Sequence, residues 1–166
     1  MSEAVAVRVK SLSRIFCVLV AVLVFLSDQV TKAMVESSIP EHAVIPILPH
    51  CFNLTHIKNA GAAFGLFSNA VAPWKTALLI VVSAALLLIV AGIVWRSCQL
   101  DWPAGVGLAL ILGGALSNLV DRLRLGRVVD FLDFYLRSYH WPSFNLADSA
   151  IVVGAGLLIL HIVFTE

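Results

Sequence analysis

Four aspartates lie close together in one polar stretch between two long apolar runs. The stretch spans residues 113–148, and its aspartates are Asp121, Asp130, Asp133 and Asp148. An aspartate inside hydrocarbon costs about 2.5–3.5 kcal/mol on insertion scales, so several carboxylates at the same depth indicate a functional site. Two carboxylates held close together cannot both ionise easily, and one keeps a proton near neutral pH while the other stays charged. Such a pair can activate a water molecule and polarise a carbonyl group, which is the chemistry of an aspartic peptidase.

The amino-acid composition indicates that this polar stretch lies at a membrane. The chain has 166 residues, of which 60% are apolar and 13% are charged. A soluble domain carries about 25% charged residues, so the deficit predicts an integral membrane protein. The length favours one domain. The formal net charge of +1 gives no electrostatic reason to expect a nucleic-acid partner.

Four segments are apolar and long enough to cross a bilayer as helices. We expect transmembrane helices over residues 15–35, 76–95, 102–120 and 146–164. The fold class expected is therefore an all-α membrane protein with four transmembrane helices. A basic N-terminal tail favours a cytoplasmic N-terminus, and an even number of spans returns the C-terminus to the same side. Residues 36–73 and 122–145 are then extracytoplasmic.

One set of charges opposes this orientation. By the positive-inside rule, basic residues next to a span favour the cytoplasm, yet three arginines would lie outside: Arg122, Arg124 and Arg127. The first helix usually dominates orientation, and these arginines alternate with apolar residues and aspartates. We therefore expect the three arginines to be paired.

The topology brings the carboxylates to one membrane boundary. Asp28 lies 13 residues after Ile15, which is about 20 Å along a helix and places it in the outer half of the bilayer. Asp121 ends the third span, Asp130 lies in the connection that follows, and Asp148 begins the fourth span. The outer boundary is therefore the expected position of Asp28, Asp121, Asp130 and Asp148. On this reasoning alone, the choice between Asp121 and Asp130 as partner of Asp148 stays open.

Two asparagines are placed to orient these carboxylates. Asn118, Asp121 and Arg122 have the i, i+3, i+4 spacing that puts side chains on one helix face. Asn145 and Asp148 repeat the three-residue spacing. Because an asparagine amide can donate two hydrogen bonds, each asparagine is expected to fix the carboxylate beside it.

Simpler roles exist for each of these aspartates. Asp148 with Ser149 could cap the fourth helix, and Asp121 with Arg122 could form an ion pair. Two other functions also use buried polar groups in membranes. A proton-coupled transporter would place them near the midplane between repeats, whereas here they lie at one edge and no repeat is visible. A non-catalytic assembly factor would use them to hold helices together.

The segment 36–73 predicts short strands rather than a span. Residues 43–48 and 51–57 have strand character, and prolines such as Pro46 favour edge strands or turns. The histidines and cysteines lack metal-binding or redox spacing, so no metal and no organic cofactor is expected.

Five short motifs follow one another in a characteristic order: SDQVTK at 27–32, NAGAAFG at 59–65, GGALSNLVDR at 113–122, VVDF at 128–131 and FNLADS at 144–149. In order and spacing the chain resembles the bacterial lipoprotein signal peptidases over nearly its whole length. The resemblance implies an aspartic endopeptidase of the bacterial inner membrane. Its substrates would be diacylglyceryl-modified prolipoproteins, cut just before the lipidated cysteine to release the signal peptide.

The resemblance also implies roles for particular residues. The catalytic pair would be Asp130 and Asp148, with six supporting or substrate-binding residues around it: Asp28, Asn59, Asn118, Asp121, Arg122 and Asn145. A small extracytoplasmic β platform and a short interfacial helix would fall within residues 36–73. The site would lie near the periplasmic leaflet, both termini would be cytoplasmic, and the protein would act as a monomer among membrane lipids.

Two positions depart from the family pattern. Ala60 stands where the family commonly has threonine, and Ser117 stands where it commonly has glycine. We expect neither residue to touch a carboxylate, so that both departures affect only local packing near Asn59 and Asn118.

Overall fold

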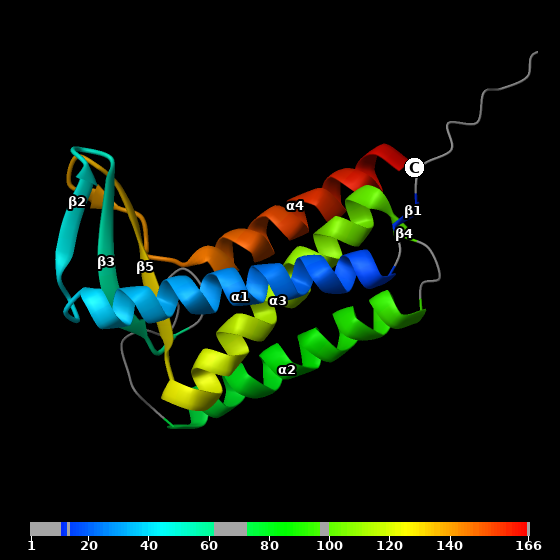
Figure 1. The fold of residues 1–166 in the computed structure, drawn as a ribbon, viewed down its shortest axis with the longest axis horizontal. Coiled ribbons are helices and arrows are strands. Elements are labelled where there is room, and N and C mark those ends of the chain that lie inside the picture. The colour runs from blue at the N-terminus through cyan, green and yellow to red at the C-terminus, as the bar shows by residue number, and fades with distance from the viewer. Residues whose placement is uncertain (1–10, 13, 62–72, 97–99, 166) are drawn as a thin grey trace, which may run out of the picture.

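Four long helices and a small β-sheet make up the computed structural model, which describes residues 11–12, 14–61, 73–96 and 100–165 (Figure 1). The helices are α1 (Arg14–Ser38), α2 (Pro73–Arg96), α3 (Trp102–Leu125) and α4 (Leu146–Thr165). All four are long and apolar enough to cross a membrane. The four predicted apolar helices are therefore confirmed.

The main difference from the expected boundaries is at the end of α3. This helix continues to Leu125, five residues beyond the predicted end at 120, so Asp121 and Arg122 lie inside the helix. Gly126 ends it with a φ of 67°, a left-handed conformation that glycine adopts without strain, and its N–H donates to the carbonyl of Arg122. The expected polar segment 122–145 therefore begins about one helical turn later than predicted.

Helix α3 is the centre of the bundle. Half of the residues in its most apolar stretch are buried inside the protein, compared with 6% in α2 and 11% in α4. Large apolar side chains on the other helices consequently point outwards, as Leu88 of α2 and Phe164 of α4 do. An apolar surface of this extent suits hydrocarbon rather than water, so the chain is a membrane protein.

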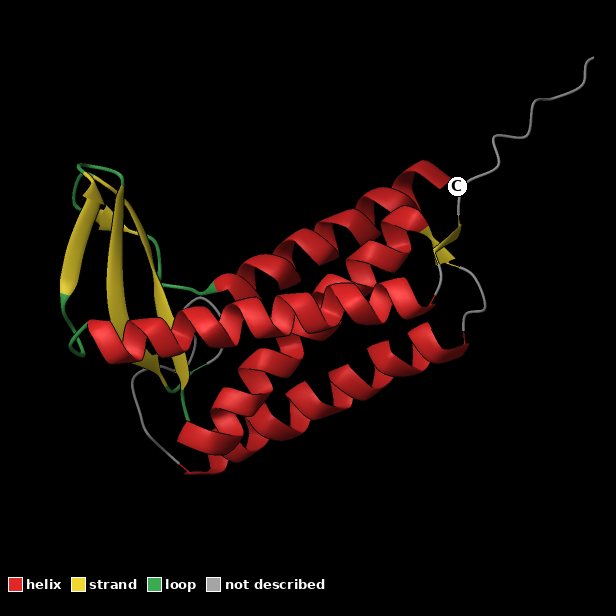
Figure 2. Cartoon of the chain, viewed as in Figure 1, coloured by secondary structure: helices red, strands yellow, loops and turns green. Residues whose placement is uncertain are grey.

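The sheet at one end of the bundle contains four antiparallel strands. They are β2 (Val44–Leu48), β3 (Phe52–Asn59), β5 (Val128–Leu136) and β6 (Tyr139–His140), in the order β2-β3-β5-β6 (Figure 2). The two predicted strands are confirmed, and the one that contains Pro46 is an edge strand, as a missing backbone donor requires. Strand β5, which carries Asp130, was not predicted from the sequence.

A hydrophobic cluster fixes the sheet to the end of α1. Val35 and Ile39, at and just beyond the end of this helix, pack with Val129 and Phe131 of β5, and all four are buried. Asp130 lies between the two β5 residues of this cluster. Burial of the apolar side chains therefore determines where the Asp130 backbone sits relative to the bundle.

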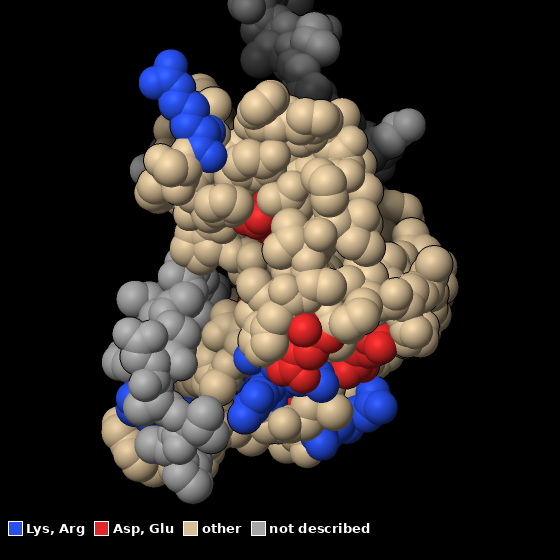
Figure 3. All heavy atoms as spheres, turned by 90° about the vertical axis from the view of Figure 1, so that its left-hand side faces the viewer, with Lys and Arg blue, Asp and Glu red and all other residues tan. Residues whose placement is uncertain are grey.

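The two ends of the bundle carry different strands. Figure 3 looks onto the sheet end and shows acidic and basic side chains gathered on part of that face, among uncharged residues. At the opposite end, β1 (Ser11–Leu12) pairs with β4 (Leu100–Asp101) near the C-terminus (Figure 1). Residues 36–61 form the end of α1 and strands β2 and β3. The expected short interfacial helix would thus fall on residues 62–72, which lie outside the described residues.

Candidate active site

Asp130 is buried where β5 meets the bundle. Only 2% of the residue is exposed, and its two carboxylate oxygens accept hydrogen bonds from two amides. Asn59, the last residue of β3, donates to Oδ2 at 2.9 Å, and Asn145 donates to Oδ1 at 2.7 Å. The Asn59 side chain is itself held by the N–H of Gly61, which donates to its Oδ1 at 2.8 Å.

The surroundings of Asp130 favour its protonated form. Burial raises the pKa of this carboxyl group from 3.8 to about 7, and the negative charge of Asp148 adds to the rise. The hydrogen bonds from Asn59 and Asn145 and the positive charge of Lys32 act in the opposite direction but do not cancel it. Asp130 therefore exchanges its proton close to neutral pH.

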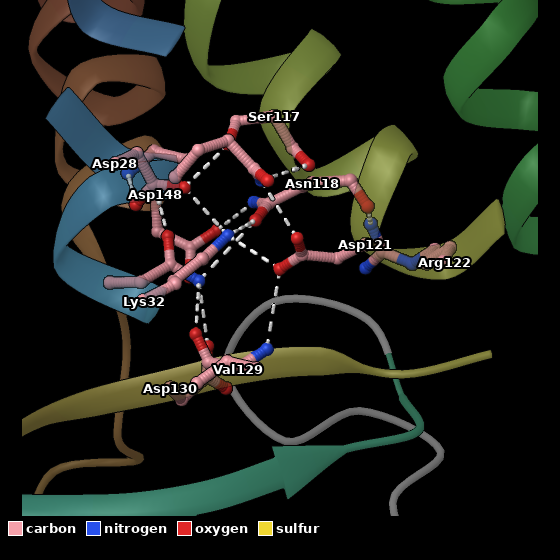
Figure 4. A network of polar contacts seen from close by, with 12 residues as sticks. Asp28, Lys32, Ser117, Asn118, Asp121, Arg122, Val129, Asp130 and Asp148 are labelled. Atoms are coloured by element: carbon pink, nitrogen blue, oxygen red, sulfur yellow. Dashed lines mark hydrogen bonds and ion pairs between the residues drawn. The ribbon is translucent and has the colours of Figure 1, made fainter. Parts of the chain in front are cut away.

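Asp148 lies in the first turn of α4, where its carboxylate faces α3. Its Oδ1 accepts a hydrogen bond of 2.8 Å from the side-chain amide of Asn118 (Figure 4). Its backbone N–H donates to Oδ1 of Asn145 at 2.9 Å. Asn145 is therefore the N-cap of α4, and the simpler reading of Asp148 as the cap is wrong. The Asp148 side chain is left available for another role.

The two asparagines connect the two aspartates. Asn145 Nδ2 lies 3.3 Å from Oδ1 of Asn118 as well as 2.7 Å from Asp130. Each asparagine therefore donates to an aspartate of another element, Asn118 to Asp148 and Asn145 to Asp130. The predicted hydrogen bond from Asn118 to Asp121 on the same helix face is wrong, because the Asn118 amide donates to Asp148 instead. Asn145 does contact its neighbour Asp148, but through the backbone N–H of Asp148.

A buried lysine that the sequence analysis did not single out lies beside this pair. Lys32 is 2% exposed, and its Nζ lies 2.6 Å from Oδ2 of Asp28 and 2.7 Å from Oδ2 of Asp121 (Figure 4). It also donates to Oδ1 of Asn118 at 2.9 Å. Its position four residues after Asp28 in the SDQVTK motif was the signal that could have identified it. In the described part of the chain, no group of three or more His, Cys, Asp or Glu side chains could hold a metal ion.

Ser117 contradicts the expectation that the family departures touch no carboxylate. Its Oγ donates to Oδ2 of Asp28 at 2.6 Å and accepts a hydrogen bond of 2.9 Å from Nε2 of Gln29. The same Gln29 amide lies 2.8 Å from Oδ1 of Asp121. A hydroxyl at position 117 therefore belongs to the polar network, because it lies on the face of α3 that packs against α1. The hydrogen bond between Asn59 and Asp130 is present beside Ala60.

Two further charged residues lie differently from what was expected. Arg122 donates to the backbone carbonyls of Asn118 and Gly61, both at 3.3 Å, while the carboxylate of Asp121 pairs with Lys32. The ion pair suggested between Asp121 and Arg122 is thus replaced by these contacts. Asp133 lies further along β5, where it binds Asn53 at 2.8 Å and His140 at 2.9 Å. It is not part of the cluster around Asp130.

An apolar groove leads to one of the two carboxylates. It lies between α2, α3 and α4 and encloses about 280 Å³. One part of its wall is polar and consists of Asn118, Arg122 and Asp148. The remainder is mainly apolar, with side chains such as Leu79, Val82, Leu86, Ile111, Leu112 and Ile151. The groove could therefore hold an apolar chain with a polar group against Asp148.

Comparison with known proteins agrees with this arrangement. A family model described as signal peptidase (SPase) II matches residues 20–164. The lipoprotein signal peptidase of Desulforapulum autotrophicum is 43% identical, over 89% of this chain and 91% of that protein. That of Solibacter usitatus is 42% identical, over 86% and 87%.

A solved structure has the same fold. It is a bacterial membrane enzyme determined by the in meso method at 2.3 Å resolution, with a TM-score of 0.79 and 31% identity. The match covers 89% of this chain and 87% of that one. Sequence and fold therefore agree over most of the chain, and the protein belongs to the signal peptidase II family of proteases.

Proposed function

We propose that this protein is a membrane aspartic endopeptidase that uses Asp130 and Asp148 to remove signal peptides from lipid-modified prolipoproteins. The observation that carries the proposal is the pair of asparagines that link the two carboxylates, one of which, Asp148, lines an apolar groove. Membership of a protease family favours this function over a transporter or an assembly factor.

The two carboxylates have different roles in this mechanism. Asp148 is ionised and takes a proton from a water molecule, whose oxygen then forms a bond to the scissile carbonyl carbon. Asp130 is protonated, in keeping with a pKa of about 7, and donates a hydrogen bond to the carbonyl oxygen as negative charge develops there. When the C–N bond breaks, the proton taken up by Asp148 passes to the leaving nitrogen. Water is thus added across the peptide bond.

The supporting residues act by orientation. Asn59 and Asn145 hold the two oxygens of Asp130, and Asn118 holds one oxygen of Asp148. Asp28 and Asp121 bind the amides of Ala147 and Val129, the residues directly before the proposed pair. Because reacting groups must be placed within a fraction of an ångström, these contacts matter for the rate as well as for folding.

The groove and the names of the relatives support one substrate class. The curated relatives are lipoprotein signal peptidases. A groove between membrane helices, apolar along most of its length and polar at Asp148, suits a membrane-anchored peptide with lipid chains on the residue after the cut. We therefore propose cleavage directly before a diacylglyceryl-modified cysteine.

The location proposed for the site is the periplasmic side of the bacterial inner membrane, with both termini in the cytoplasm. The basic N-terminal tail supports this orientation. A monomer surrounded by lipids is the proposed working unit.

Lipid dependence tests the function. Purified protein in bilayers is given two synthetic precursors that differ only in the cysteine after the cut, one diacylglyceryl-modified and one unmodified. We expect the modified precursor alone to be cut, and mass spectrometry should place the new N-terminus at that cysteine. Equal cleavage of both precursors, or a cut elsewhere, would contradict the proposed substrate.

A further inference from the structure

The buried ammonium group of Lys32 lies between the segments that carry Asp130 and Asp148. Its Nζ contacts Asp28, Asp121 and Asn118 at 2.6, 2.7 and 2.9 Å, and its side chain is 3% exposed. A charged lysine is tolerated at such burial only when anions surround it. Figure 4 shows the ammonium group at the point where these contacts meet.

Each anion bound to Lys32 also holds the backbone next to one aspartate of the proposed pair. Oδ1 of Asp28 accepts a hydrogen bond of 2.9 Å from the N–H of Ala147, directly before Asp148. Oδ2 of Asp121 lies 3.4 Å from the N–H of Val129, directly before Asp130. Without the ammonium group, Asp28 and Asp121 would repel each other, and both backbone contacts would be disturbed.

The same charge acts on the pair across a short path of hydrogen bonds. Asn118 accepts from Lys32 with its oxygen and donates to Asp148 with its nitrogen, so one amide joins the cation to that carboxylate. The positive charge of Lys32 lowers the pKa of Asp130. In a buried site this effect is screened only weakly by water.

Several charged groups surround the ammonium group. Among the described residues, they are Asp28 on α1, Asp121 and Arg122 on α3, Asp130 on β5 and Asp148 on α4. Asp28 and Asp121 favour proton uptake by the pair, whereas Lys32 and Arg122 favour proton release. The balance between these charges determines how many protons the pair holds near neutral pH.

We propose that Lys32 is a positioning residue that fixes the separation of Asp130 and Asp148 and sets the pH range in which the pair holds one proton. It acts through Asp28, Asp121 and Asn118 and does not touch the reacting atoms. The proposal rests on the catalytic role of the pair, but its electrostatic part can be measured without substrate.

The test compares variants with opposite charge changes. Lys32→Met removes the cation, and Asp28→Asn removes an anion that contacts it. The infrared C=O stretching band of protonated carboxyl groups is followed against pH in the purified protein, with Asp130→Asn used to assign the band of Asp130. In Lys32→Met, the midpoint pH at which this band is lost is expected to rise by about half a pH unit or more. In Asp28→Asn, the same midpoint is expected to fall. Lys58→Met is the matched control, since Lys58 of β3 pairs with Glu41 at 3.1 Å, and it should leave the band in place.

The pH dependence of cleavage gives a second readout. In Lys32→Met, kcat is expected to fall about tenfold or more, with KM changed less and with the rate maximum moved to higher pH. A purely structural lysine would lower thermal stability in both variants without opposite spectral shifts. If Lys32→Met does not insert into the membrane, the infrared measurement on Asp28→Asn alone tests the proposal. A midpoint pH that stays unchanged or rises in that variant overturns it.

Failure of this proposal is distinct from failure of the proposed function. If the parent protein does not cut the lipidated precursor, the function is wrong, whatever the infrared bands show. If the parent does cut it and the opposite band shifts are missing, the role of Lys32 is wrong and the function stands.

Discussion

The side-chain amide of Asn145 donates a hydrogen bond of 2.7 Å to Oδ1 of Asp130, and so joins the start of α4 to β5. The oxygen of the same amide accepts from the backbone N–H of Asp148 at 2.9 Å. One buried residue thus caps the last helix with its oxygen and orients a carboxylate with its nitrogen. These two roles can be separated by mutation.

Asn145→Ser is expected to lower kcat while the helix stays capped. Serine is a good N-cap residue but has no amide to donate to Asp130. Losing a hydrogen bond to a charged or titrating group costs about 1.5–3 kcal/mol, which corresponds to about 10- to 100-fold in rate. Asn145→Ala, the comparison variant, should lose similar activity and about 1 kcal/mol more stability, because the cap is lost too. Single-turnover cleavage and thermal unfolding would measure the two effects. Equal melting temperatures for the two variants would contradict the capping role.

The rate of cleavage is expected to fall above neutral pH. The proposed mechanism needs the proton on Asp130, and that proton is lost as the pH rises through its pKa of about 7. Above this value kcat/KM should therefore fall about tenfold for each pH unit. Initial rates between pH 5 and pH 9, with folding checked by circular dichroism at each pH, would test this. A rate that stays constant or rises up to pH 9 is incompatible with a protonated Asp130.

Asp130 is expected to lower stability at the pH where the enzyme works. Its folded pKa of about 7 exceeds the usual 3.8, so the folded state binds this proton more tightly than the unfolded state does. Stability is then lost as the pH rises between these values, by about 4 kcal/mol in total at 1.36 kcal/mol per pKa unit. Asp130→Asn should be more stable relative to the parent at pH 8 than at pH 5. Denaturant unfolding at both pH values would show it, and a difference that does not depend on pH would contradict the assigned pKa.

Close packing between α3 and α4 is expected to be as important as the polar contacts. A Cβ atom on Gly114 would collide with the carbonyl oxygen of Ala147, directly before Asp148. Gly114→Ala should push the start of α4 away, weaken the contact between Asn118 and Asp148, and lower both activity and melting temperature. Gly156→Ala, on the partner helix α4, is the control, since a Cβ there meets nothing within 4 Å. Similar behaviour of both variants would refute this packing argument.

The bundle could be predicted from the sequence because its signals are local. Charge-free runs of about 20 residues identify membrane helices, and each of the four was found within a few residues of its true ends. The largest error was at the end of α3, where Asp121 and Arg122 were taken to end the apolar span. Both continue the helix because Lys32 and two backbone carbonyls satisfy them inside the protein.

The site was less predictable because its contacts join distant segments. Strand β5 was missed, as its pairing with β3 connects residues 69 to 82 positions apart, from Asn59 with Val128 to Phe52 with Phe134. Spacing along a helix predicted that each asparagine would bind the carboxylate beside it, whereas in the folded protein Asn118 donates to Asp148 on another helix. The geometry brings together all eight residues that the sequence analysis selected, and adds Lys32, Gln29 and Ser117, whose partners lie on other helices.

The central claim is that Asp130 and Asp148 together cut the precursor. The most direct test measures cleavage of a diacylglyceryl-modified precursor by Asp130→Asn and by Asp148→Asn, each purified in bilayers and shown to be folded. Asp133→Asn is the matched control, because Asp133 lies on the same strand but contacts Asn53 and His140. We expect the first two variants to lose at least about 10³-fold in rate, the scale on which removal of a catalytic group acts, and the control to cleave at a near-parental rate. Normal cleavage by a folded Asp130→Asn or Asp148→Asn protein would contradict the central claim.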